Sequence, residues 1–239
     1  MFQPLEKKRY FEQIADLIMK RIFNEKLKEG YKLPSEQQLS IELNVSRSVV
    51  REALRILDVM GHVKIKKGPQ GGIFVSSLIH KPFCDSLRNL ATNGQVTVDH
   101  LFDARLRIEP FIVEEAINNI NEDGIQKLLQ LKKDGEKHPE DPAFLKQINM
   151  EFHSLLAVIS GNPVYAIIMK SLIEILIELN YNFLNPVFEK ELFRVHSNII
   201  DTIVKKDIHK ATKLVTDDIL FVKKNLKKFV NKNNISYKK

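Results

Sequence analysis

The sequence predicts a mainly α-helical protein with two parts, an N-terminal winged helix-turn-helix and a C-terminal all-α bundle of about seven helices. Two features of the 239-residue chain support this fold class. Apolar residues recur at helical spacing through nearly the whole chain, whereas alternation typical of paired strands occurs only at residues 62–75. A chain of this length can also build two separate hydrophobic cores.

The first two predicted elements are helices separated by a turn. Residues 10–24 carry one apolar stripe at helical spacing, which predicts a helix. After this helix, Ser35 and Gln38 form the S-x-x-Q pattern of a capping box. We therefore expect a short second helix from Ser35 to about residue 43.

A third helix and a hairpin complete the N-terminal part. Asn44 interrupts the second helix, and Ser46 is a favourable N-cap for a helix that continues to residue 60. Gly61 follows at the position where a glycine commonly ends a helix. Residues 62–75 then alternate, turn at "GPQGG" and alternate again, which predicts a two-stranded wing.

The remaining sequence predicts a linker, a helical domain and a tail. We assign residues 1–76 to the winged helix domain, 77–83 to a linker, 84–231 to the helical domain and 232–239 to a basic tail. The helical domain should bind an effector and dimerise. Its helices are predicted near residues 84–93, 98–119, 123–134, 142–159, 163–184, 189–206 and 208–230.

Composition and charge limit the class of protein. The single cysteine, Cys84, excludes an internal disulfide framework and is expected in the core. No apolar run reaches the length of a membrane span, so we expect a cytoplasmic protein without a membrane partner. Residues 1–75 hold 14 Lys and Arg against 9 Asp and Glu, and this basic excess favours a polyanionic partner for the N-terminal part.

The third helix has the features of a DNA recognition helix. Arg47 and Arg51 lie in its first two turns, beside Ser48, where a helix in the major groove meets bases and phosphates. Exposed arginines alone would indicate only a solvated face, but the capped helix before them and the basic hairpin after them favour DNA binding. Arg55 lies one turn further on, where we expect a salt bridge to the body of the domain.

The stretch "LPSEQQLSIELNVSRSVVREALRILDVMGHV", followed by "GGIFV", resembles the winged helix-turn-helix of GntR-family transcription regulators. This chain departs from the family pattern at Gln37, where an arginine is common. A glutamine there lacks the positive charge of arginine and its two parallel hydrogen bonds to guanine. The resemblance and the pattern together give these candidate DNA contacts: Ser35, Gln37, Ser46, Arg47, Ser48, Arg51, Lys66, Lys67 and Gly68.

Five polar residues interrupt the apolar stripes of the helical domain. Burying them is costly unless they are paired or ligated. Each has an ordinary explanation, as a hydrogen-bonded core histidine or as an arginine paired with a carboxylate such as Asp218. Together, their imidazole and oxygen donors could also bind a divalent metal. The five are Arg105, Asn149, His153, His196 and Asp218.

The helical part resembles the FCD effector-binding domain of the FadR subfamily, through "RLRIE" at 105–109, "N-x-x-FH" at 149–153, "SGN" at 160–162, "H-x-x-II" at 196–200 and "D-x-x-x-A" at 207–211. Many members hold a metal with one aspartate and three histidines. Here the resemblance places Asn149 at the aspartate position and Asp218 at one histidine position. It implies a zinc, nickel or manganese site formed by Asn149, His153, His196 and Asp218. The alternative is a metal-free pocket in which Asp218 pairs with Arg105 or a histidine.

The sequence thus predicts a regulator, acting as a repressor, whose operator affinity depends on a small carboxylate effector. Arg105 is the candidate for bidentate binding of that carboxylate, and Asn162 is a second candidate effector contact. Recognition of a palindromic operator predicts a homodimer. Two alternatives remain, a metal-dependent enzyme with a DNA-binding appendage and an architectural DNA binder that needs no effector. No nucleophile motif favours the enzyme.

Overall fold

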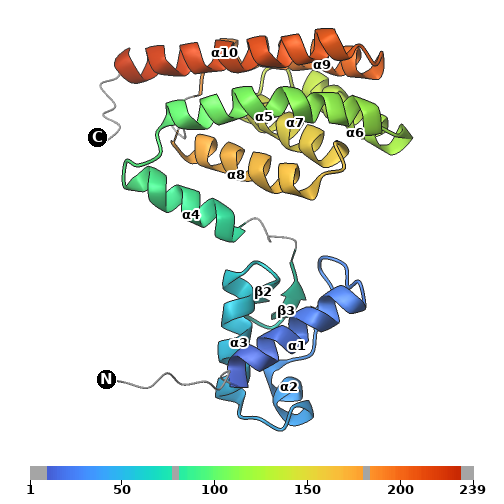
Figure 1. Cartoon of the computed structure of the whole chain (residues 1–239), viewed down its shortest axis with the longest axis vertical. Helices are drawn as coiled ribbons and strands as arrows, with labels where there is room; N and C mark the ends of the chain where they lie inside the picture. The colour runs from blue at the N-terminus through green and yellow to red at the C-terminus, as the bar shows by residue number, and fades with distance from the viewer. Residues whose placement is uncertain (1–9, 77–80, 180–183, 233–239) are drawn as a thin grey trace. The chain divides into compact units, whose positions relative to one another are not determined.

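The computed structural model describes residues 10–76, 81–179 and 184–232. The chain divides into two compact units, Met1–Pro82 and Phe83–Lys239 (Figure 1). The fold class predicted from the sequence is confirmed, because the first unit is a winged helix-turn-helix and the second consists of helices.

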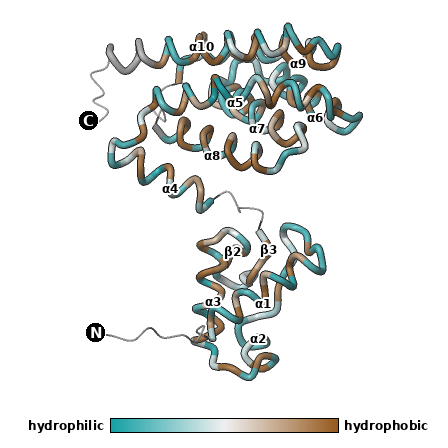
Figure 2. The backbone as a smooth tube through the Cα atoms, viewed as in Figure 1, coloured by the Kyte–Doolittle hydropathy of each residue, from teal (hydrophilic) through white to brown (hydrophobic). Residues whose placement is uncertain are grey.

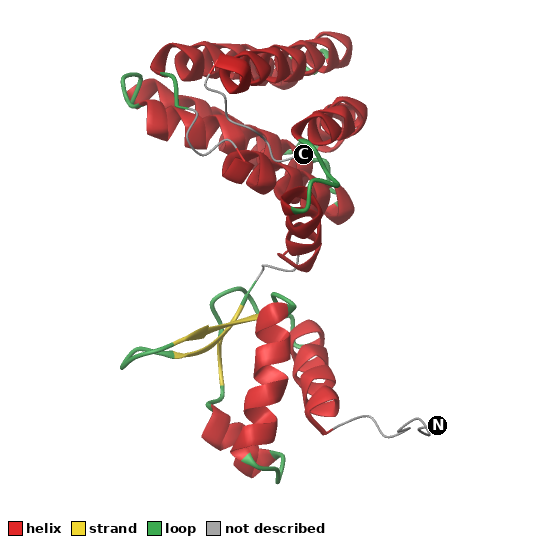
Figure 3. Ribbon diagram, turned by 90° about the vertical axis from the view of Figure 1, so that its left-hand side faces the viewer, coloured by secondary structure: helices red, strands yellow, loops and turns green. Residues whose placement is uncertain are grey.

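The N-terminal unit combines three helices with a small sheet, and its wing projects from the helices in Figure 3. Its elements are α1 (Tyr10–Asn24), β1 (Lys32–Leu33), α2 (Glu36–Glu42), α3 (Arg47–Val59), β2 (Val63–Lys66) and β3 (Gly72–Val75). The sheet is antiparallel in the order β1-β3-β2, with Val63 opposite Val75. Strand β1 was not predicted, since two residues are too few for an alternating pattern and only pairing with β3 defines them.

The predicted helix caps are confirmed. Ser35 and Gln38 form a capping box at the start of α2, and the Ser46 side chain accepts from the backbone N–H of Val49 at the start of α3. Asn44 has a φ of 49° in the turn between these helices. Asparagine tolerates this left-handed conformation better than most residues, which explains why the turn forms here.

Helix α3 has one buried and one exposed side. Val50, Ala53, Leu54 and Leu57 are fully buried and pack against α1 and α2. Hydrophilic and hydrophobic segments alternate along this and the other helices in Figure 2. Substituting one such leucine by alanine typically costs about 2–5 kcal/mol. The buried side thus fixes α3 in the domain and leaves its other side for contacts with a partner.

The C-terminal unit contains seven described helices, α4 (Lys81–Thr92), α5 (Val98–Asn119), α6 (Glu122–Lys137), α7 (Pro142–Ile159), α8 (Pro163–Leu179), α9 (Pro186–Val204) and α10 (Ile208–Lys232). The predicted linker is too long at its C-terminal end, because α4 already begins at Lys81. Pro82 lies in the first turn of α4, where its missing N–H costs no helical hydrogen bond. Parts of the predicted linker, of the predicted 163–184 helix and of the basic tail lie outside the described residues.

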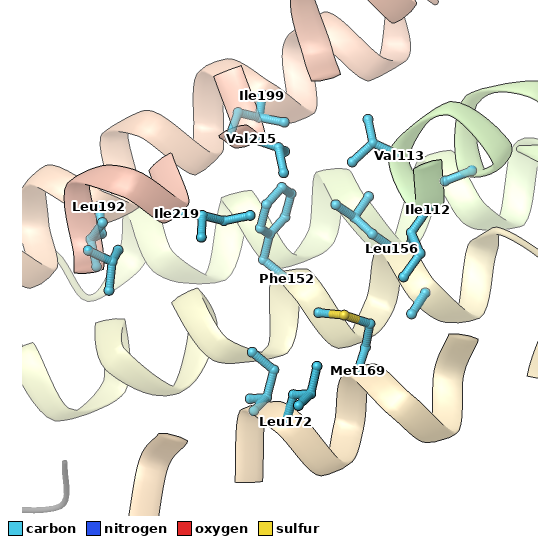
Figure 4. Packing of buried hydrophobic residues seen from close by; sticks show 14 of the residues in the cluster. Ile112, Val113, Phe152, Leu156, Met169, Leu172, Leu192, Ile199, Val215 and Ile219 are labelled. Atoms are coloured by element: carbon cyan, nitrogen blue, oxygen red, sulfur yellow. The ribbon is translucent and has the colours of Figure 1, made fainter. Parts of the chain in front are cut away.

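Helices α5 and α10 run side by side over α7, and α7 packs against α8 and α9 (Figure 1). Phe152 of α7 lies at the centre of this packing, next to Val215 and Ile219 of α10, with Met169 of α8 on the other side (Figure 4). All four side chains are fully buried. The helices that carry the candidate site are therefore held by one continuous core.

The expectation for Cys84 is confirmed, since this residue is buried in the core. Burial and the neighbouring Glu174 raise the pKa of its thiol to about 11. No helix within the described ranges has both the length and the apolar character needed to cross a bilayer.

Candidate functional site

The first candidate site is the exposed side of α3. Arg47, Ser48 and Arg51 all lie on the solvent side of this helix, opposite its buried leucines. Ser48 is hydrogen-bonded through its Oγ to the Oγ of Ser46 at 2.8 Å. The first two turns of α3 therefore present two guanidinium groups and a hydroxyl to the surroundings.

Arg51 pairs with a carboxylate on the preceding helix. Its Nη2 lies 2.9 Å from Oε2 of Glu36 in the first turn of α2, and its Nε donates to the same oxygen at 3.2 Å. The hydrogen bond and the charge of Glu36 raise the pKa of Arg51. Arg55, for which we expected a salt bridge to the body of the domain, instead lies 3.6 Å from Glu52 on its own helix. The contact between helices is thus made by Arg51.

The two candidate serines at the helix starts already have structural contacts. Ser35 accepts from the backbone N–H of Gln38, and its own N–H and hydroxyl donate to the Gln38 side chain. Ser46 caps α3 in a similar way. Gln37, next to these residues on α2, is exposed. Any contact of the serines with DNA would add to a capping role.

The wing contributes basic groups at its tip. Lys66 ends β2 and Lys67 follows it, and both are exposed. The Lys66 ammonium lies 4.9 Å from the ring centroid of Phe74 on β3. Gly68 has a φ of 99°, a conformation that glycine adopts most easily, and so permits the tight turn. The basic groups of the wing are held at a hairpin end, as a contact with phosphate or the minor groove requires.

The second candidate site lies inside the helical unit. All five polar residues singled out in the sequence are buried there and come from four helices. Arg105 is on α5, Asn149 and His153 are on α7, His196 is on α9, and Asp218 is on α10. The structure therefore brings these residues together, and it adds two glutamates that the sequence did not identify.

Glu109 is the first added residue and joins Arg105 to His153. Arg105 Nε donates to Glu109 Oε2 at 2.9 Å, and Glu109 Oε1 is hydrogen-bonded to His153 Nδ1. Burial alone would raise the pKa of Glu109, but Arg105 and His153 together lower it to about 2. Of the two partners expected for Asp218, Arg105 or a histidine, Arg105 is instead paired with Glu109, one helical turn away on the same face of α5, and the histidines lie beside Asp218.

Glu189 is the second added residue and holds Asn149. The Asn149 amide donates to the backbone carbonyl of Glu189 at 3.1 Å and to its carboxylate at 3.0 Å. The amide oxygen of Asn149 lies 3.1 Å from Nδ1 of His196 and accepts from it. Asn149 therefore orients His196 through Nδ1.

Both histidines direct their remaining nitrogen at Asp218. His196 Nε2 lies 3.3 Å from Asp218 Oδ2, and His153 Nε2 lies 3.7 Å from the same oxygen. Despite these distances, His196 Nε2 and both Asp218 oxygens have no hydrogen bond of normal geometry, and all three atoms are fully buried, so the His196–Asp218 contact is an electrostatic one. Burial alone would raise the pKa of Asp218, but His196 lowers it, which favours the charged form of the carboxylate. Buried polar atoms without hydrogen bonds are rare and need an explanation.

A divalent metal fits this donor set. Ligand atoms of His153, His196 and Asp218 lie within 4.8 Å of one another, and two imidazoles with one carboxylate suit zinc and related ions. Glu109 and Asn149 fix the ring orientations through Nδ1, as outer residues commonly do around metal-bound histidines. Asn149 Oδ1 is thus directed at His196, so the structure places it beside the three donors, as an orienting residue.

A small cavity adjoins this cluster. It has a volume of about 30 Å³ and is lined by Arg105, Asn149, His153 and His196, among others. Asn162 is not among its lining residues. Its side chain instead accepts from the backbone N–H of Val164 at the start of α8, which is a local turn interaction.

The two missed glutamates left a signal in the sequence. Glu109 is four residues after Arg105, and Glu189 is seven residues before His196, so each shares a helix face with an identified residue. Both are charged residues on an apolar stripe, the same pattern that marks Arg105 and Asp218 in the sequence.

Each of the two units matches a known protein family. Residues 11–75 match the family described as bacterial regulatory proteins, gntR family, and residues 100–220 match the FCD domain. The chain is 28% identical over 220 residues to the uncharacterized HTH-type transcriptional regulator YcbG of Bacillus subtilis, with 92% of this chain and 91% of the relative covered. It is 27% identical over 219 residues to the Exu regulon transcriptional regulator of Escherichia coli K12, with 86% and 80% covered.

Two further comparisons extend this result. The chain is 28% identical over 225 residues to the HTH-type transcriptional repressor NanR of Salmonella newport, with 87% of this chain and 82% of the relative covered. A solved structure of a Streptococcus agalactiae GntR protein is 30% identical, with a TM-score of 0.63, and covers 90% of this chain and 99% of its own. The curated relatives named here are transcriptional regulators.

Proposed function

This chain belongs to the GntR family of bacterial transcription regulators, with an FCD domain as its C-terminal half. From that premise we propose that it represses transcription as a homodimer of the FadR subfamily and that a small carboxylate, bound beside a divalent metal, releases it from its operator. The observation that carries the effector part of this proposal is that His196 Nε2 and both Asp218 carboxylate oxygens are buried without a hydrogen bond, and that His153 offers a further donor atom beside them.

The DNA-binding part of the proposal rests on α3. Arg47, Ser48 and Arg51 enter the major groove, and Lys66 and Lys67 on the wing bind the neighbouring minor groove or phosphates. The exposed ion pair of Arg51 with Glu36 supports this role, because such pairs contribute little to stability and DNA phosphate can replace the carboxylate. Two winged domains acting on one operator require two copies of the chain.

The metal part of the proposal assigns His153, His196 and Asp218 as ligands. A divalent ion there would compensate the buried carboxylate and offer open positions to a carboxylate ligand. Arg105 lies at the same cavity, and Glu109 balances its charge and fixes its guanidinium, so the N–H groups that Glu109 does not use can donate to the effector carboxylate.

We propose that the protein represses transcription and that the effector relieves this repression. One relative is itself described as a transcriptional repressor, and another as the regulator of a regulon. An effector that binds one arrangement of the helical domain more tightly shifts the population of states, and operator affinity changes by the same coupling energy.

Metal content provides a direct test. Protein purified without chelators and dialysed against zinc, nickel or manganese should retain about one ion per chain, measured by mass spectrometry. His196→Ala should lose the ion, because one of three ligands is removed. His209→Ala is the matched control, since this exposed histidine lies on α10 away from the cluster. Absence of metal from both variants and from the unsubstituted protein would exclude the metal site.

Operator binding tests the regulatory part. Fluorescence anisotropy with genomic fragments from around the coding region should identify a specific site, and small carboxylates should weaken its binding when metal is present. If specific binding is found but no carboxylate changes it, the architectural binder becomes the better description.

A further inference from the structure

The cavity at the buried cluster is too small for an organic effector. Its volume of about 30 Å³ leaves room for roughly two water molecules. Pockets that hold small organic ligands commonly measure about 300–1,000 Å³. An effector that reaches Arg105 and the histidines must therefore extend beyond this cavity.

A large groove lies directly outside the cavity. It runs between α7 and α8 and has a volume of about 960 Å³. Lys146, Met150 and Ile177 line both the groove and the inner cavity. The two spaces therefore adjoin at these three side chains, and a ligand that occupies both must pass beside them.

The lining of the groove indicates the chemistry of its ligand. Much of it is apolar, and some of these side chains are well exposed, Val158 at 62% and Leu184 at 46%. A sugar acid would need a hydrogen-bonding partner for each hydroxyl group, whereas a hydrocarbon chain needs only apolar contact. The apolar side chains are Ala143, Met150, Leu155, Val158, Ile173, Ile177 and Leu184, and polar groups of Gln147, Glu151, Ser154, Lys170 and Glu174 line the rest beside Lys146.

Lys146 supplies the charge at the inner end of the groove. It lies one turn before Met150 on α7 and is half-buried, and burial lowers its pKa despite the nearby Glu189 carboxylate. Glu189 in turn holds Asn149 and, through it, His196. An anion bound at Lys146 would therefore lie next to Glu189, which orients His196 through Asn149.

We infer that the effector is an amphipathic carboxylate, such as a medium-chain fatty acid, whose hydrocarbon tail lies in the α7–α8 groove and whose head group passes Lys146 toward the inner cavity. This inference rests on the proposed function and narrows its ligand class from carboxylates in general. Lys146 is its specificity-determining residue.

Binding of a carboxylate series to the full-length, metal-loaded protein tests the inference by calorimetry. Affinity should rise from acetate to butyrate to octanoate by about fourfold for each methylene group that enters the groove. Octanoate should bind more tightly than galacturonate, a compact polyhydroxylated acid. Equal affinity across the series, tighter binding of galacturonate, or no binding of any of these acids would overturn the inference.

Two lysine variants provide the matched comparison. Lys146→Met keeps the length of the side chain but removes its charge and should weaken octanoate binding about tenfold. Lys170→Met removes the charge of a lysine that lines only the groove, and it should weaken binding by less than about threefold. Equal losses in the two variants would overturn the role of Lys146.

A third variant tests the position of the tail. Ser154 lines the groove but not the inner cavity, so Ser154→Phe should fill groove volume while leaving the buried cluster intact. It should weaken octanoate binding at least tenfold and leave acetate binding unchanged, and unchanged octanoate binding would overturn the inference.

Operator binding separates this inference from the proposed function. If octanoate binds in a Lys146-dependent manner but does not change operator affinity, the groove assignment stands and regulation by carboxylate fails. If galacturonate releases the operator and Lys146→Met does not alter that release, the proposed function stands and the groove assignment is overturned.

Discussion

The two units of this chain use the same kind of ion pair in opposite surroundings. In the winged helix domain, Arg51 and Glu36 pair at the surface, where half of the arginine side chain is exposed. In the helical domain, Arg105 and Glu109 pair in the core, where 3% and 0% of their side chains are exposed. Both pairs have a shortest N–O distance of 2.9 Å, so geometry alone does not distinguish them.

The difference lies in what each pair can exchange. Solvent screens the surface pair, and DNA phosphate can replace its carboxylate at little cost. The buried pair cannot lose one partner without leaving an unpaired charge in the core, which is strongly unfavourable. We therefore expect DNA binding by the first unit to be electrostatic and sensitive to salt, and ligand binding by the second to depend on fit to a preformed cluster.

The largest expected effect comes from Glu109→Gln. This change leaves the buried guanidinium of Arg105 without a counter-charge and His153 without its carboxylate partner. The free energy of unfolding of the helical domain should fall by about 3–5 kcal/mol, measured by urea denaturation followed by circular dichroism. Glu36→Gln is the matched control and should hardly move the transition of the winged domain. Similar shifts in both variants would remove the distinction between the two pairs.

Arg51→Ala tests whether the surface pair serves binding. Operator affinity should fall about tenfold or more in fluorescence anisotropy, since a guanidinium in the groove is lost, while the melting temperature changes little. Arg55→Ala should have a smaller effect on binding, because Arg55 lies further from the start of α3 and contacts only its own helix. An equal loss in the two variants would show that the arginines of α3 act as one uniform basic face.

Ser46 allows capping to be separated from DNA binding. Ser46→Ala should lower the free energy of unfolding of the winged domain by about 1 kcal/mol, because the cap on the Val49 N–H is lost. Ser46→Asp keeps a capping oxygen but adds a negative charge, so stability should be retained in thermal melts and operator binding should weaken. Full operator binding by Ser46→Asp would place Ser46 away from the phosphates.

Lys67→Ala should have the smallest effect. Loss of one phosphate contact at the wing should lower the slope of log affinity against log salt by about one and weaken binding to all sequences alike. Lys213→Ala, an exposed lysine on α10, is the control and should leave the slope unchanged. A change in sequence preference in Lys67→Ala would instead indicate that the wing reads bases.

Much of the fold could be predicted because its signals are local. Helix α5 begins at Val98 and α7 at Pro142, as expected, and the Ser35–Gln38 capping box forms. Strand β1 could not be predicted, since only its pairing with β3 creates it. The helix α4 begins earlier than the sequence predicts, because Pro82 is typical of a linker but is also compatible with the first turn of a helix.

The buried site was predicted only in part for a related reason. Periodicity identified Arg105, His153, His196 and Asp218 as polar residues facing a core, because that signal lies within each helix. Which of them pair depends on distances between helices. Here Arg105 pairs with Glu109, four residues further along the same helix. Asn162, the second candidate effector contact, does not line the cavity. Its side-chain oxygen accepts a hydrogen bond from the Val164 N–H in a local turn.

By itself, the sequence determined the two-part architecture, the recognition helix and the identity of most buried polar residues, because hydrophobic period, capping and family motifs are properties of short segments. Only the tertiary structure decided that Arg51 bridges two helices, that Glu109 and Asn149 orient the histidines, and that Lys146 lies between a small cavity and a large groove. The packing of α5, α7, α8, α9 and α10 sets these distances, and no segment of the chain contains that information alone.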